Sequence, residues 1–213
     1  MPKELSLENL YKDLGYIIHG NYVQDFLFEI FPPERDVEIL EPGCGSAKFS
    51  LYYALAGCRV VALDIDPEVL KYARRLMKGL EGLEGGGFWR PAIWRGDIHH
   101  LHLGKNRFSL VFNEGVPQHW VEEDLRQGSI NEMARVSKDM VIIIGNNGLN
   151  PKEQEIDRTF QFRYVGMPPT RKCFTPEELK MRMEKAGLAE VKLEPLGGSW
   201  QDATLLAGWG RKK

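Results

Sequence analysis

The chain has few cysteines, no long apolar run and almost no net charge, and each of these absences excludes a class of protein. Its 213 residues include three cysteines, an odd number without metal-ligand spacing, so the sequence indicates neither a disulfide framework nor a zinc site. No apolar run approaches the roughly 20 residues needed to cross a bilayer. The charged start, Met1 to Leu5, lacks the apolar core of a signal peptide, so we expect a cytoplasmic protein without a membrane partner.

The near-neutral charge also bears on possible partners. Lys and Arg total 28 and Asp and Glu total 30, which leaves a formal charge of −2. A protein that binds along a nucleic acid needs a concentrated positive face, because it must neutralise phosphates. The balance therefore disfavours nucleic acid as the main partner, although it leaves room for a small local basic patch.

Short, almost wholly apolar runs alternate with longer amphipathic stretches over most of the chain. Runs such as 110–112 and 141–144 are typical of strands buried on both faces, so we predict an α/β fold with a mostly parallel sheet. The expected strands are 37–41, 59–64, 93–96, 108–113, 140–145, 189–194 and 203–210. The expected helices include 46–56, 67–78, 122–138 and one that Thr175 caps and Gly187 ends. A short loop joins the last two strands, which predicts an antiparallel pair.

Three further segments interrupt or precede this alternation. Two amphipathic helices are expected before Pro32-Pro33, and residues 1–36 form a separate N-terminal segment. The glycine-rich run 79–87 is expected to be a turn-rich connection. A polar stretch, 150–163, indicates an inserted helix.

The most informative segment joins the first expected strand to its helix through Glu41-Pro42-Gly43-Cys44-Gly45. Glycine allows a sharp turn and a close approach of a ligand to the backbone, and the following helix start offers free N–H groups. The second strand ends at Asp64, where an acid can accept hydrogen bonds from both hydroxyls of a ribose. Together these features predict a nucleoside-binding site.

Two details indicate which nucleoside is bound. A dinucleotide site favours a third glycine where this chain has Lys48. The carboxylate of Glu41 would repel a pyrophosphate, but it suits a ligand that carries an ammonium or sulfonium charge. A nicotinamide-dependent dehydrogenase is therefore the least favoured reading of this turn.

These motifs, taken in order, resemble those of the class I S-adenosylmethionine-dependent methyltransferases over roughly residues 37–210. Residues 41–45 resemble the first motif, which lies against the amino-acid end of the cofactor. Asp64-Ile65 resembles the second motif, which holds the ribose, and Asp97-Ile98 the third, which holds adenine. Ala47 stands where many members have a third glycine, and we expect alanine, a small and good helix former, to serve there.

The resemblance implies a Rossmann-like, doubly wound, mostly parallel sheet of seven strands with a C-terminal antiparallel pair and added N-terminal helices. It implies S-adenosylmethionine as the cofactor and a domain over residues 37–213, with 150–170 as a substrate-side insertion. Segment 1–36 is then expected to act with the insertion as a lid that selects the acceptor. The candidate cofactor-binding residues are Tyr11, Tyr16, Glu41, Gly43, Cys44, Gly45, Asp64, Ile65, Asp97, Ile98 and Asn113.

The candidate catalytic residues, Glu114 and His119, follow the fourth strand. Glu114 could accept the acceptor's proton or hold its cation, and His119 could act as a base if it faces the cleft. The alternatives are that Asn113 and Glu114 only line the methionine end of the cofactor, and that His119 flanks the next helix. For Tyr11 and Tyr16 the alternative is a packing role.

The acceptor is expected to be a small molecule. Enzymes that methylate base amino groups in nucleic acid usually carry an Asn/Asp-Pro-Pro-aromatic turn after the fourth strand, whereas this chain has Asn113-Glu114-Gly115-Val116. The Pro-Cys nucleophile of pyrimidine carbon methylation is also missing. The alternatives are a methyltransferase that acts on RNA or protein, and a non-catalytic module that only binds the cofactor. The histidines of His99-His100-Leu101-His102 lack added ligands, so a solvated loop is favoured over a metal site.

Overall fold

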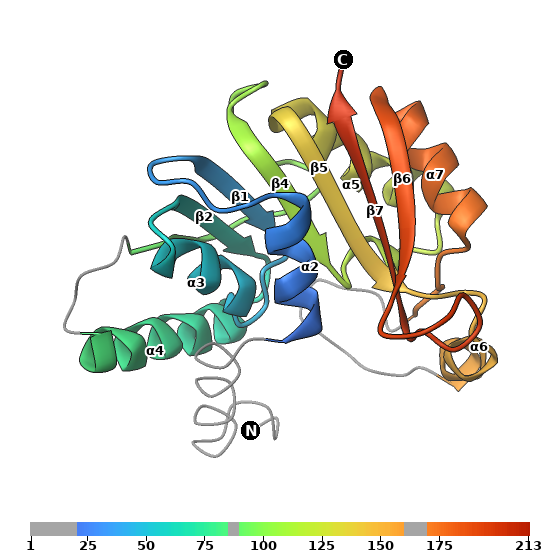
Figure 1. Ribbon diagram of the computed structural model, residues 1–213, viewed down its shortest axis with the longest axis horizontal. Coiled ribbons are helices and arrows are strands. Elements are labelled where there is room, and N and C mark those ends of the chain that lie inside the picture. The colour runs from blue at the N-terminus through green and yellow to red at the C-terminus, as the bar shows by residue number, and fades with distance from the viewer. Residues whose placement is uncertain (1–20, 85–89, 160–169) are drawn as a thin grey trace. The chain divides into compact units, whose positions relative to one another are not determined.

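The chain divides into two compact units, residues 1–97 and 98–213. The computed structural model describes residues 21–84, 90–159 and 170–213. Within these ranges it has seven strands alternating with helices, which confirms the predicted α/β class (Figure 1). No helix in the described part is long and apolar enough to cross a membrane.

The first unit is a parallel three-stranded sheet with connecting helices packed on it. Its strands follow the order β3-β2-β1, and Pro42 at the end of β1 lies opposite Leu63 in β2. The carboxyl ends of β1 and β2 therefore lie side by side, where parallel α/β sheets bind ligands. The elements are α2 (Tyr22–Ile30), β1 (Glu38–Pro42), α3 (Lys48–Leu55), β2 (Arg59–Asp64), α4 (Pro67–Glu84) and β3 (Ala92–Arg95).

The glycine-rich run 79–87 is more helical than we predicted. Helix α4 continues through Gly79 and Gly82 to Glu84, while residues 85–89 lie outside the described ranges. The reason is a buried stripe of Tyr72, Leu76 and Leu80 at helical spacing, which packs on the core cluster around α3. Burial of this stripe outweighs the roughly 1 kcal/mol that each glycine costs inside a helix.

Helix α2 confirms one of the two helices expected before the prolines; the other lies outside the described residues. Asn21 caps α2, because its Oδ1 accepts hydrogen bonds from the backbone N–H of Val23 and Gln24 at 3.0 and 3.2 Å. At the other end the buried hydroxyl of Tyr53, from α3, lies 3.0 Å from the Leu27 carbonyl and 3.1 Å from that of Phe31. Tyr53 therefore fastens the end of α2 to α3.

The second unit is a four-stranded mixed sheet in the order β4-β5-β7-β6. Strands β4 and β5 are parallel, and β7 is antiparallel to both β5 and β6, which confirms the predicted C-terminal pair. Helices α5 and α7 pack on the sheet and against each other (Figure 1). The elements are β4 (Phe108–Glu114), η2 (Pro117–His119), α5 (Glu123–Val136), β5 (Ser137–Asn146), α6 (Pro151–Thr159), α7 (Pro176–Lys185), β6 (Leu188–Leu196) and β7 (Leu205–Lys212).

The predicted ends of α7 are confirmed. The Thr175 hydroxyl accepts the Glu178 N–H at 3.2 Å, and Gly187 after the helix has a left-handed φ of 86°. Close packing of α7 on the sheet requires Gly208 in β7, where a Cβ would lie 2.9 Å from Leu179 Cδ2 and from Met183 Sδ.

The fastening of α2 can be tested with Tyr53→Phe. Loss of the hydroxyl removes a donor from the buried Leu27 carbonyl and the partly buried Phe31 carbonyl, so we expect the free energy of unfolding to fall by about 1 kcal/mol. Urea unfolding followed by circular dichroism would measure it. The control is Tyr22→Phe, whose side chain is exposed and whose change should stay within about 0.5 kcal/mol. Equal effects of the two changes would contradict the fastening.

Candidate active site

The glycine turn after β1 is held by the end of β2. The N–H groups of Gly43 and Cys44 donate to the Leu63 carbonyl at 2.7 and 2.9 Å, and the Gly45 N–H donates to Asp64 Oδ2 at 2.9 Å. Gly43 and Gly45 have φ of 73° and 52°, the left-handed region that favours glycine. The structure therefore brings together the turn and the acid that the sequence predicted.

Asp64 is fixed from two sides. Its Oδ1 accepts the Asp66 N–H at 2.9 Å, in addition to the bond from Gly45. Burial raises the pKa of this carboxyl, and backbone N–H bonds from Asp66, Gly45 and Ile65 oppose the rise. Each carboxylate oxygen can accept more than one hydrogen bond, so both can still accept a hydroxyl. Asp66 instead caps α4, as predicted, by accepting the Glu68 N–H at 2.8 Å.

Glu41 lies at the end of β1 and is only 2% exposed. Its Oε2 accepts the N–H of Ser50 at 3.0 Å and the hydroxyl of Ser50 at 2.5 Å. Ser50 is in the first turn of α3, whose N-cap residue Ala47 makes no side-chain cap. Glu41 therefore caps α3 from the neighbouring strand, where a negative charge also favours the helix N-terminus. Its contact with a ligand cation stays a prediction.

Ala47 has a different backbone conformation from the helical one expected of a good helix former. Its φ and ψ are 58° and 27°, in the left-handed region, and α3 begins one residue later at Lys48. A Cβ in this conformation costs roughly 1–2 kcal/mol. The family's glycine at this position therefore has a conformational reason, and alanine is accepted only as a small, fully buried side chain.

The other predicted cofactor residues of the first part of the chain are reported by position. Cys44 is buried, and burial together with the charges of Glu41 and Asp64 raises the pKa of its thiol, so it is a neutral side chain rather than a reactive one. Ile65 and Asp97 are half-buried and Ile98 is buried. Tyr11 and Tyr16 lie outside the described residues.

In the second unit, Asn113 shapes the turn that follows β4. Its side chain is fully buried, and its Oδ1 accepts the Val116 N–H at 3.1 Å. Gly115 within this turn has a left-handed φ of 80° and donates its N–H to the Ile144 carbonyl of β5 at 2.8 Å. Glu114, the last residue of β4, is half-buried. The turn leads directly into η2, which carries His119.

His119 is buried against residue Thr170. Its Nδ1 lies 3.2 Å from the Thr170 carbonyl, and the Thr170 hydroxyl donates to the His119 carbonyl at 3.2 Å. A carbonyl only accepts, so we assign the ring proton to Nδ1 and the lone pair to Nε2. Burial lowers the pKa of the imidazole below its ordinary value, so the ring is neutral at pH 7. A neutral histidine in this tautomer can accept a proton.

Sequence reasoning missed the pair that holds η2 to β5. Gln118 Nε2 donates to Asn146 Oδ1 at 2.5 Å, and the Asn146 N–H donates to Gln118 Oε1 at 2.6 Å. Gly145 makes room for this pair, since a Cβ there would lie 3.1 Å from Gln118 Oε1 and 2.9 Å from Phe174 Cδ2. The available signal was a glycine followed by asparagine at the end of a buried strand.

In the histidine-rich loop His100 and His102 are exposed, as expected of a solvated loop, whereas His99 packs. His99 Nε2 lies 3.1 Å from the Leu125 carbonyl, and its ring meets that of Trp120 edge-on. Within residues 21–84, 90–159 and 170–213, no three His, Cys, Asp or Glu side chains form a group that could hold a metal ion.

Comparisons with known proteins indicate the family of this chain. Residues 40–144 match the sequence pattern of a methyltransferase domain family. A solved S-adenosylmethionine-dependent methyltransferase from Archaeoglobus fulgidus superposes with a TM-score of 0.67 at 16% identity, covering 95% of this chain and 99% of that one. Residues 40–144 therefore belong to this methyltransferase family, and the fold is that of the class I S-adenosylmethionine-dependent methyltransferases.

Further relatives of this methyltransferase chain differ in what they act on. Magnesium protoporphyrin IX methyltransferase from Synechocystis, solved with bound SAH, has a TM-score of 0.63 at 17% identity and covers 95% of this chain and 86% of that one. A malonyl-[acyl-carrier protein] O-methyltransferase of Pectobacterium atrosepticum is 39% identical over 112 residues, which are 53% of this chain and 39% of that protein. The chain thus matches about two fifths of the length of such curated relatives.

S-adenosylmethionine is the cofactor of this family, and the residues present fit it. The fixed carboxylate of Asp64 matches a ribose, and the open, left-handed glycine turn admits a ligand close to the backbone: a Cβ added at Gly45 would meet nothing within 4 Å. This fit concerns the first unit alone and agrees with the Rossmann-like class predicted from the sequence.

The role of Asp64 can be tested against its neighbour Asp66. We expect Asp64→Asn to weaken S-adenosylmethionine binding about 10- to 100-fold, because hydrogen bonds to a charged acceptor contribute about 1.5–3 kcal/mol. Asp66→Asn removes an equally buried charge but keeps a good helix cap, so its dissociation constant should stay within about twofold. Isothermal titration calorimetry compares the two. Equal weakening by both would contradict a ribose contact at Asp64.

The cap from Glu41 can be tested with Ser50→Ala. The buried carboxylate loses a short hydrogen bond, and we expect the free energy of unfolding to fall by about 1–3 kcal/mol in urea denaturation. Ser199→Ala is the matched control, because Ser199 donates to Asp202 at 2.6 Å in an exposed pair. Its effect should stay within about 0.5 kcal/mol. A neutral Ser50→Ala would show that Glu41 does not depend on this bond.

Proposed function

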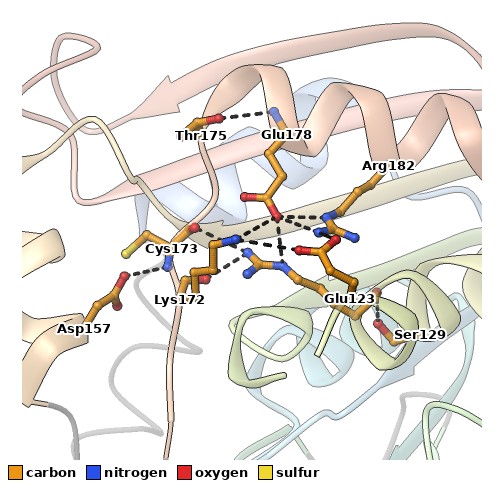
Figure 2. A network of polar contacts seen from close by, with 9 residues as sticks. Glu123, Ser129, Asp157, Lys172, Cys173, Thr175, Glu178 and Arg182 are labelled. Carbon is orange, nitrogen blue, oxygen red and sulfur yellow. Dashed lines mark hydrogen bonds and ion pairs between the residues drawn. The ribbon is translucent and has the colours of Figure 1, made fainter. Parts of the chain in front are cut away.

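We propose that this protein transfers a methyl group from S-adenosylmethionine to a small-molecule acceptor. A small-molecule acceptor is supported by one observation: the Arg and Lys side chains near η2 and the start of α7 are paired with carboxylates of the chain itself. Arg171 lies 3.0 Å from Glu153 and 2.6 Å from Asp157. Figure 2 shows Lys172 and Arg182 beside the carboxylates of Glu123 and Glu178, and Glu178 lies 3.8 Å from Lys172 and 2.8 Å from Arg182. Cations already paired by the chain's own carboxylates are poorly suited to bind a phosphate backbone.

The chain's own residues would bind, orient and deprotonate. When bound, S-adenosylmethionine supplies an electrophilic methyl group for an in-line displacement. Asp64 and the turn at Gly43 and Gly45 would hold the nucleoside and its amino-acid end, and the alignment of the two reactants supplies much of the rate. His119 Nε2 would take up the acceptor's proton, while Glu114 would hold a cation on the acceptor.

A second candidate is the O-methylation of a carboxylate on an acyl group. It is favoured by the similarity to the malonyl-[acyl-carrier protein] O-methyltransferase of Pectobacterium atrosepticum. A carboxylate is already ionised at neutral pH, so such a reaction needs no base. The need for His119 therefore separates the two candidates.

Acceptor selection is proposed for two segments of the chain. Residues 1–36 and 150–170 are assigned to a lid, and the described part of the second segment is α6. Helix α6 contributes Glu153, whose carboxylate accepts the side-chain N–H of Asn146 at 2.8 Å beside the end of β5. An acceptor that reaches this end of β5 would meet amide and carboxylate groups.

The experiment is incubation with methyl-labelled S-adenosylmethionine and a cell extract, followed by separation by mass. We expect label in the low-mass fraction, and a loss of about 10²- to 10⁴-fold in His119→Gln with unchanged cofactor affinity. Label in an alkali-labile, protein-bound ester with full activity of His119→Gln would favour the second candidate. Label in nuclease-sensitive material, or no transfer despite tight cofactor binding, would overturn the proposal.

A further inference from the structure

We propose that Arg171 is a positioning residue that fixes the imidazole of His119 by holding residues 170–173, which we call the strap. The inference rests on the proposed function, in which His119 is the base. Arg171 acts through its neighbour: the carbonyl of Thr170 is 3.2 Å from His119 Nδ1, and the Thr170 hydroxyl is 3.2 Å from the His119 carbonyl. Thr170 therefore contacts both the ring and the backbone of His119, so a shift of Thr170 would move the ring.

Two carboxylates of α6 hold Arg171. Its Nε donates to Asp157 Oδ1 at 2.6 Å, and one Nη donates to the Glu153 carboxylate at 3.0 Å and to the Glu153 backbone carbonyl at 3.1 Å. The Arg171 side chain is 8% exposed, so these contacts are shielded from water. The planar guanidinium can reach both acids at once, which a lysine ammonium on its flexible stem cannot reproduce.

Hydrogen bonds hold the strap to α6 on one side and to η2 on the other. Asp157 Oδ2 also accepts the Cys173 N–H at 2.6 Å, a contact visible in Figure 2, so Asp157 grips the strap at two residues. On the other side the Lys172 N–H donates to the Gln118 carbonyl of η2 at 2.9 Å. Since Gln118 binds Asn146 and Asn146 binds Glu153, the contacts form a closed ring through η2, the strap, α6 and the end of β5.

Charge and geometry act on His119 together. Among the described charged groups, Arg171 of the strap and Asp157 of α6 shift the pKa of His119 in opposite directions, Arg171 lowering it and Asp157 raising it, and burial is the largest cause of its low value. A substitution that keeps the positive charge at position 171 but removes the planar guanidinium therefore separates the effect of hydrogen-bond geometry from the effect of charge. Arg171→Lys is that change, and Arg158→Lys on the exposed side of α6 is its control.

The test is a nuclear magnetic resonance titration of the five histidines in the full chain, with His119 assigned by its absence in His119→Gln. In Arg171→Lys we expect the His119 pKa to rise toward its ordinary value, because contact with water relieves burial, the largest cause of the low pKa, while loss of the Thr170 bond opposes part of this rise. The acid limb of the pH–rate profile should move up with it, and methyl transfer should fall about 10- to 100-fold with unchanged cofactor affinity. Arg158→Lys should match the parent chain in every measurement.

A merely structural role predicts a different result. Arg171→Lys would then lower the unfolding temperature and leave the His119 titration of the folded protein unchanged, which would overturn the proposal. If Arg171→Lys does not fold, Glu153→Gln is the second variant. It weakens the bond between Arg171 and residue 153 but keeps a hydrogen-bond acceptor there, so we expect a smaller rise of the His119 pKa. A shifted titration with full activity of His119→Gln would support positioning by Arg171 and reject His119 as the base.

Discussion

Buried polar side chains at the carboxyl ends of the parallel strands must be hydrogen-bonded, and the rest of the structure depends on how this is done. Glu41, Asp64 and Asn113 are each at most 9% exposed. A buried group without partners costs about 1–3 kcal/mol, so each is held by backbone N–H groups of a nearby turn or helix. Glu41 accepts an N–H at the start of α3, Asp64 accepts one from the glycine turn, and Asn113 accepts one from the turn before η2.

This constraint joins folding and binding in the same residues. A carboxylate already fixed by two N–H groups, as in Asp64, keeps lone pairs for a ligand and loses little conformational freedom on binding. His119 follows the same rule, because the carbonyl that satisfies its Nδ1 also leaves Nε2 as the basic nitrogen. In the proposed site, the hydrogen bonds that satisfy these buried groups would also orient them toward their ligands.

Features carried by local pattern could be predicted from the sequence, and features carried by distant pairing could not. The strands, the glycine turn, Asp64 and the cap at Asp66 follow from periodicity and turn chemistry within a few residues. The bond between Glu41 and Ser50 depends on how β1 packs on α3, and nothing near either residue signals it. Ala47 shows that local pattern can also mislead, because the high helix propensity of alanine does not reveal that this residue has a left-handed φ.

Helix α6 and the strap depend on each other for an electrostatic reason. Glu153 and Asp157 are four residues apart, so they share one face of the helix, where like charges destabilise it. The guanidinium of Arg171 touches both carboxylates and removes this repulsion only when the strap is in place. The cation in turn would be costly to bury without the two acids. The helix and the strap therefore stabilise each other, and the carbonyl that contacts His119 is held through Arg171 by two carboxylates that lie more than ten residues earlier in the chain.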